Sequence, residues 1–141
     1  MVGPVIKVDP AELPRRANLY WLGGRESSQL PAYAKGFDVC MMPFALNDAT
    51  KFISPTKTLE YMAAHKPIVS TSVADVVGSY AEAVAICATP EEFVVAIDRA
   101  LAEAPEQRDK RFAREKEILA RNSWDTISAR MDEKMREAES R

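Results

Sequence analysis

Residues 54–70 read Ser-Pro-Thr-Lys-Thr-Leu-Glu-Tyr-Met-Ala-Ala-His-Lys-Pro-Ile-Val-Ser, and they predict a loop, a helix and a buried strand in succession. Ser54 and Pro55 are typical of a helix start, because serine offers a capping oxygen and proline has no N–H group to leave unpaired. Pro67 ends the helix, and the apolar pair Ile68 and Val69 begins a strand. This unit of helix and strand decides the fold.

The flanking segments alternate in the same way. Continuous apolar runs predict strands at residues 2–8, 19–22, 38–44, 67–71 and 83–87. Apolar spacing and end signals predict helices at 30–35, 73–80 and 90–103, and two charged helices beyond residue 105, with Thr89 and Ser123 as caps. Strands that alternate with helices predict an α/β fold with a parallel sheet.

The predicted sheet brings several polar residues to one crevice. Ligands of open parallel sheets bind outside the carboxyl ends of the strands, and the loop at 45–54 leaves such an end. We therefore expect Asn47, Ser54, Lys57 and Glu60 to lie near one another. Lys57 and Glu60 share one helix face near the helix N-terminus, which suits a phosphate. Taken alone the motif is weak, and an ordinary solvated helix face stays open as its alternative.

Composition excludes several function classes. The chain has 141 residues, is 47% hydrophobic and carries a formal net charge of −2, so it has no basic surplus for nucleic acid. Its apolar runs are strand-sized, and we do not expect its first residues to form a signal peptide. Cys40 and Cys87 lie in apolar runs, which predicts buried free thiols in the cytoplasm. No cluster has metal-ligand spacing, and His65 is expected to cap a helix or lie on the surface.

Four segments in order resemble a known family: residues 18–23 (NLYWLG), 30–33 (LPAY), 37–44 (FDVCMMPF) and 54–70. Together they resemble the C-terminal, donor-binding domain of GT-B glycosyltransferases, in the group that includes the retaining bacterial cell-surface sugar transferases. The resemblance runs from about residue 2 to residue 101, and residues 122–125 (NSWD) resemble the closing helix of that domain. It implies a Rossmann-like parallel sheet with flanking helices.

The resemblance also implies a substrate and a site. The substrate would be a nucleotide-diphosphate sugar, with no further cofactor and no metal. Ser54, Pro55 and Thr56 would line the diphosphate, with Lys57 close to it, and Glu60 would hold the ribose hydroxyls. The loop around Asn47 would approach the sugar. The sugar acceptor would be a saccharide or a lipid-linked molecule, and the resemblance assigns no catalytic residue in this chain.

The chain departs from the family in composition and in length. Phe52 stands where many relatives carry a glutamate, and His65 stands where glycine is usual. The first domain and the first strand of the second domain have no counterpart, since residues 2–4 resemble the end of the second strand. We therefore expect a fragment that is inactive alone, with a partial Rossmann-like domain at 1–104 and a helical extension at 105–141.

Expected partners follow from this reading. They are the nucleotide-sugar donor and either an N-terminal acceptor domain or a second chain bound through the open sheet edge. A full-length form would lie at the surface of a membrane. Two alternatives stay open. One is a non-catalytic interaction module with a degenerate donor site. The other, ranked lower, is a sugar-nucleotide epimerase, which needs acid–base residues that the sequence does not offer.

Overall fold

A computed structural model describes residues 1–140. Its centre is a parallel sheet of three strands, β1 (Cys40–Met42), β2 (Ile68–Thr71) and β3 (Ala85–Cys87), in the order β1-β2-β3. Val69 and Ser70 of β2 are each paired on both sides, Val69 with Met41 and Ala85 and Ser70 with Met42 and Ile86. The predicted α/β fold with a parallel sheet is confirmed.

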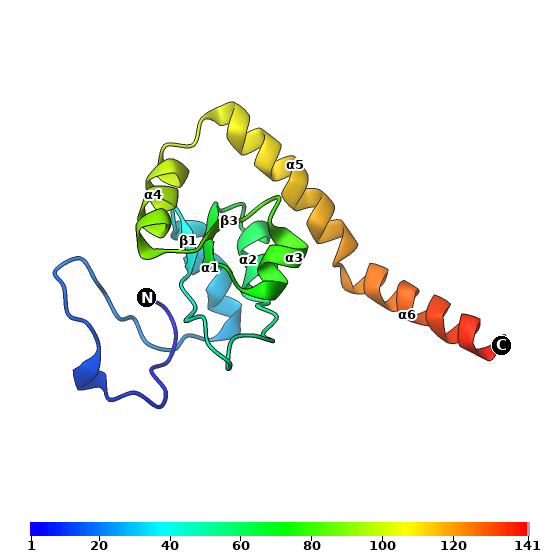
Figure 1. Cartoon of the computed structure of the whole chain (residues 1–141), viewed down its shortest axis with the longest axis horizontal. Coiled ribbons are helices and arrows are strands. Elements are labelled where there is room, and N and C mark those ends of the chain that lie inside the picture. Colours follow the sequence, from blue (N-terminus) through cyan, green and yellow to red (C-terminus); the bar gives the residue numbers. More distant parts are fainter. Residues whose placement is uncertain (141) are drawn as a thin grey trace.

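Helices cover both faces of this sheet. They are α1 (Leu30–Gly36), α2 (Lys57–Ala63), α3 (Ala74–Tyr80), α4 (Pro90–Leu101), α5 (Pro105–Arg121) and α6 (Trp124–Glu139), with short 3-10 turns at Pro10–Glu12 and Ser27–Gln29. Figure 1 shows the strands between α4 on one side and α2 with α3 on the other. The predicted caps are confirmed, because the hydroxyls of Thr89 and Ser123 accept hydrogen bonds from the backbone N–H groups of Glu92 and Thr126.

The core lies between the sheet and the helices α2, α3 and α5. Met62 on α2, Val76 on α3 and Ile118 on α5 are fully buried there. They pack with other buried apolar residues, namely Cys40, Met42, Ile68, Val73, Tyr80, Ala83 and Val84. Helix α5 thus contributes to the core of the sheet domain, and the division of the chain at residue 104 stays a prediction.

Helix α6 projects away from the rest of the molecule (Figure 1). Trp124 at its start is 84% exposed, and Met131 and Met135 are also exposed.

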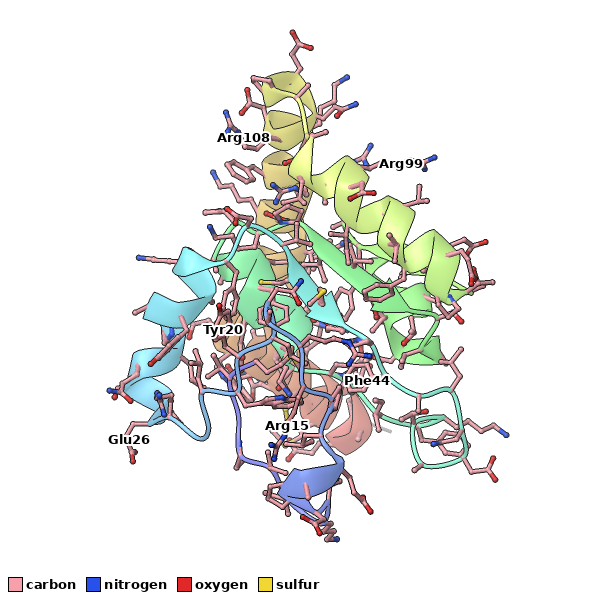
Figure 2. All side chains as sticks on the ribbon, turned by 90° about the vertical axis from the view of Figure 1, so that its left-hand side faces the viewer. Arg15, Tyr20, Glu26, Phe44, Arg99 and Arg108 are labelled. Atoms are coloured by element: carbon pink, nitrogen blue, oxygen red, sulfur yellow. The ribbon has the colours of Figure 1, made fainter. Side chains whose placement is uncertain are left out.

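In Figure 2, Arg99 on α4 and Arg108 on α5 lie at one end of the molecule, and Arg15 and Glu26 in the N-terminal region lie at the other. Within residues 1–140, no helix combines the length and the hydropathy that crossing a membrane requires.

The strands predicted at residues 2–8 and 19–22 are wrong. The two segments do lie alongside each other, since the Met1 ammonium donates to the Tyr20 carbonyl at 2.7 Å and Leu22 N–H donates to the Met1 carbonyl at 2.9 Å. Neither segment joins the sheet of β1, however, and Tyr20 is 67% exposed. An apolar run becomes a stable strand only where a neighbouring strand supplies a hydrogen-bonded ladder and a buried face.

The strands predicted at 38–44 and 83–87 are shorter than expected. Strand β1 stops at Met42 because the next residue is Pro43, which has no N–H group for the ladder. Strand β3 starts at Ala85 because the N–H groups of Ala83 and Val84 both donate to the carbonyl of Tyr80, at the end of α3. The missing N–H group of Pro43 therefore sets the end of β1, and the hydrogen bonds to Tyr80 set the start of β3.

Candidate functional site

The starts of three helices meet at the carboxyl edge of the sheet. Strand β1 leads through a loop to α2, β2 leads directly to α3, and β3 leads to α4. The hydroxyl of Thr71, the last residue of β2, donates to the carbonyl of Phe44 at 2.9 Å. This bond holds the loop after β1 against the end of β2, so the edge predicted to bind the ligand is formed by adjacent strand ends.

Asn47 organises the loop that leaves β1. Its side-chain oxygen accepts hydrogen bonds from the backbone N–H groups of Ala49 and Thr50, at 3.0 and 3.2 Å. The hydroxyl of Thr50 in turn donates to the carbonyl of Ala45. The Asn47 side chain is exposed, but its oxygen is occupied within the loop, which leaves the amide nitrogen to face a ligand.

Helix α2 begins at Lys57, two residues later than the predicted start at Ser54 and Pro55. Ser54 does not cap the helix, since the N-cap residue is Thr56 and no side chain accepts a capping hydrogen bond; the Ser54 hydroxyl instead donates to Oδ2 of Asp75 at 3.0 Å. The carbonyl of Pro55 accepts from the N–H group of Thr58 at 3.1 Å, in a turn that precedes the helix. In the described part of the chain, the N–H groups of Thr56 and Lys57 have no hydrogen-bond partner.

The two charged residues predicted for the site lie on the outer side of α2. Thr58 and Met62 are buried against the core, and the Thr58 hydroxyl lies 3.6 Å from the sulfur of Met42. Lys57 and Glu60 are exposed, and no ion pair within residues 1–140 involves either of them. One cation and one carboxylate are therefore free to meet a ligand within a single turn of the helix.

Asp75 is a residue of this edge that the sequence did not single out. It lies in the first turn of α3, four positions after the end of β2, and it is half-buried. The hydrogen bond from Ser54 joins it to the loop before α2, across 21 residues of sequence. An acid in the first turn of the helix that follows a strand was the available signal, although it is equally typical of a helix N-terminus with no ligand.

The structure describes both residues at which the sequence departs from the family that it resembles, Phe52 and His65. Phe52 is 88% exposed and offers no carboxylate at its position in the loop. His65 ends α2 in a left-handed conformation, with φ of 56°, and its N–H group donates to the carbonyl of Met62. His65 therefore ends the helix and has a side chain that is 54% exposed, as predicted.

A groove in the described structure lies away from these residues. It encloses about 770 Å³ along α4 and the start of α5, and it is lined by Ala85 and Ile86 of β3, by Arg99 of α4 and by Arg111 of α5, among others. None of the six predicted site residues lines it. The predicted residues instead form an open, polar edge.

The two cysteines are the first residue of β1, Cys40, and the last residue of β3, Cys87. Cys40 and Cys87 are free and buried, and burial raises the pKa of the Cys40 thiol to about 11, which keeps it protonated at neutral pH. Among residues 1–140, no group of three or more His, Cys, Asp and Glu side chains is placed to hold a metal ion.

Comparisons with known proteins agree with the architecture. The model of the family described as Glycosyl transferases group 1 matches residues 2–103. The chain is also 32% identical over 62 residues to TuaH of Bacillus subtilis (strain 168), whose name provisionally assigns it as a teichuronic acid biosynthesis glycosyltransferase. That alignment covers 44% of this chain and 16% of the relative, so the chain matches about a sixth of the length of TuaH.

Proposed function

Since the chain belongs to the glycosyl transferases group 1 family, we propose that it is the donor-binding part of a glycosyltransferase and binds a nucleotide-diphosphate sugar. The ligand would lie at the carboxyl edge of the sheet, over the start of α2. Transfer of the sugar would go to a saccharide or lipid-linked acceptor. The name of TuaH, which refers to teichuronic acid biosynthesis, supports an acceptor in cell-surface polysaccharide synthesis.

One observation carries this proposal. The family match covers all three strands and helices α1 to α4, and within it Lys57 and Glu60 are exposed, unpaired and one helical turn apart. An exposed lysine beside the unpaired N–H groups of Thr56 and Lys57 suits a diphosphate. A carboxylate accepts hydrogen bonds from vicinal hydroxyls, which suits the ribose. The diphosphate is anionic and the ribose is neutral, so Lys57 suits one part of a nucleoside diphosphate and Glu60 suits the other.

The chemistry proposed for this edge is stabilisation of a leaving group. When the bond between sugar and diphosphate breaks, negative charge grows on the diphosphate. Fixed N–H groups and an ammonium that already point at it favour that charge without reorganisation. The acceptor would be activated by groups outside this chain, so the proposal predicts that the chain alone binds the donor and transfers no sugar.

The test is calorimetry of this chain with uridine, guanosine and thymidine diphosphates and with their hexose conjugates. We expect one nucleotide family to bind, and Glu60→Ala to weaken that binding by about 10-fold or more, because a hydrogen bond to a charged group is lost. Glu133→Ala, an exposed glutamate on α6, is the matched control and should bind as the wild type does. Absence of binding to every ligand, or equal binding by Glu60→Ala, would overturn the proposal.

A second function rests on the edge of β1. Strand β1 pairs with β2 on one side only, and its exposed residue Met41 lies at the open side of the sheet. An unpaired edge of this kind can pair with a second copy of the chain, which is the behaviour of a non-catalytic interaction module. Sedimentation separates the two functions: a monomer that binds a nucleotide favours the donor site, and a stable oligomer that binds none favours the module.

A further inference from the structure

Resting on the proposed function, we propose that Asp75 determines specificity by accepting a hydrogen bond from a hydroxyl of the donor sugar. The observation behind it is the contact between Asp75 and Ser54. The Ser54 hydroxyl lies 3.0 Å from Oδ2 of Asp75, and Ser54 belongs to the segment proposed to line the diphosphate. The carboxylate of α3 is thereby held at the same edge of the sheet as Lys57 and Glu60.

The hydrogen-bond partners of the Asp75 carboxylate indicate what it can bind. An ionised carboxylate only accepts hydrogen bonds, and its two oxygens offer about four acceptor positions. Ser54 uses one position on Oδ2, and Oδ1 has no hydrogen-bond partner within residues 1–140. No Lys, Arg or His in that range forms an ion pair with Asp75. Asp75 is therefore half-buried, without a cationic partner among residues 1–140, and has an oxygen open to a donor group.

Charge decides which part of the ligand Asp75 can face. A carboxylate placed beside a diphosphate is repelled, since both groups are anions, and the repulsion is strongest where water is excluded. Sugar hydroxyls are neutral donors, and a carboxylate binds them without that penalty. Of the two parts of the ligand, the hexose and not the diphosphate is therefore expected to lie beside Asp75. Phe52, in the loop on the β1 side, offers no carboxylate for the sugar.

This assignment changes the role of Ser54. A serine hydroxyl has a single proton, and here that proton is directed to Asp75. Ser54 therefore positions Asp75, and the donors left for the diphosphate are the N–H groups of Thr56 and Lys57 with the Lys57 ammonium. An ordinary reading also exists, in which Asp75 only complements the N-terminus of α3. That reading predicts no effect of Asp75 on ligand choice.

The experiment compares two ligands on three proteins by calorimetry. The ligands are the nucleoside diphosphate that binds the wild type and its hexose conjugate. The proteins are the wild type, Asp75→Asn and Asp98→Asn, the last being an exposed aspartate near the C-terminal end of α4 that serves as the matched control. Asparagine keeps one oxygen for Ser54 and replaces the second acceptor with an NH₂ donor. Thermal unfolding verifies that each variant is folded.

We expect Asp75→Asn to bind the hexose conjugate about tenfold more weakly and the nucleoside diphosphate within about twofold of the wild type. Asp98→Asn should change neither affinity. Equal losses for both ligands, or no loss for either, would overturn the role of Asp75 and leave the donor site standing. If the wild type binds neither ligand, the proposed function itself fails, and the role of Asp75 fails with it.

Discussion

The guanidinium of Arg111 donates hydrogen bonds to both carboxylate oxygens of Glu103, from Nε at 2.8 Å and from Nη2 at 2.7 Å. Its Nη1 donates to Oε1 of Glu115, which lies one turn further along α5 and is 0% exposed. One arginine thus joins the connection between α4 and α5 to a carboxylate buried under α2. Oε2 of Glu115 lies 3.6 Å from Nδ1 of His65, so the cluster also connects α5 to the end of α2.

Arg111→Ala is expected to destabilise the fold strongly. It leaves the carboxylate of Glu115 buried without its cation, and removing one partner of a buried ion pair costs about 3–5 kcal/mol. The free energy of unfolding from urea denaturation measures the effect. Arg108→Ala, an exposed arginine on the same helix, is the matched control. Equal stability of the two variants would show that the cluster does not hold α5.

Glu115→Gln is expected to retain the wild-type stability at neutral pH, or exceed it. Burial raises the pKa of Glu115, although Arg111 and His65 favour its charged form. Between the raised pKa of the folded state and the ordinary value of 4.5, the folded state therefore binds a proton that the unfolded chain does not. Glu115 thus adds stability as the pH falls towards 4.5.

The pH dependence of unfolding in urea tests that sign. Glutamine is a neutral isostere, so the Glu115→Gln variant should lack the part of the pH dependence that Glu115 contributes. Glu115→Ala, which leaves a cavity, should be less stable than both. A Glu115→Gln variant that is clearly less stable than the wild type at neutral pH would show that the charge itself is favourable in the folded state.

His65→Gly is expected to be more stable than His65→Ala by about 1 kcal/mol, because φ at this position is 56° and only glycine adopts it without strain. Both variants lose the ring contact with Phe112 at 4.7 Å and the approach to Glu115 at 3.6 Å. The difference in their unfolding free energies therefore isolates the backbone term. Equal values would mean that residue 65 is not left-handed in solution.

Thr71→Val is expected to lower the unfolding free energy by about 1 kcal/mol, because the carbonyl of Phe44 loses its hydrogen bond from the Thr71 hydroxyl. The loop after β1 should loosen as well, which would weaken nucleotide binding measured by calorimetry. A variant with reduced stability and unchanged affinity would show that the loop between β1 and α2 does not contribute to the site.

Local signals in the sequence were sufficient for the central part of the fold. The apolar run at 67–71 and the caps Thr89 and Ser123 depend on neighbouring residues only, and the structure confirms them. The strands predicted at 2–8 and 19–22 are wrong because a strand also needs a distant partner, which apolar character alone does not guarantee.

The site was predictable in part for the same reason. Lys57 and Glu60 share a face of α2 because they are three residues apart, which followed from the sequence, and their binding of a donor stays a prediction. The contact between Ser54 and Asp75 did not, because it joins residues 21 apart through the arrangement of β1 and β2. Glu115 was similarly hidden, since a buried acid in a highly charged helix looks like a solvated one until its neighbours are known.

The most direct test of the account is an NMR titration of the ¹⁵N-labelled chain with the hexose conjugate that binds most tightly in calorimetry. The account predicts that backbone amide shifts concentrate at Asn47, at residues 54–60 and at Asp75, with α6 unaffected. Shifts confined to the groove between α4 and α5, or no shifts at saturating ligand, would contradict the placement of the donor at the carboxyl edge of the sheet.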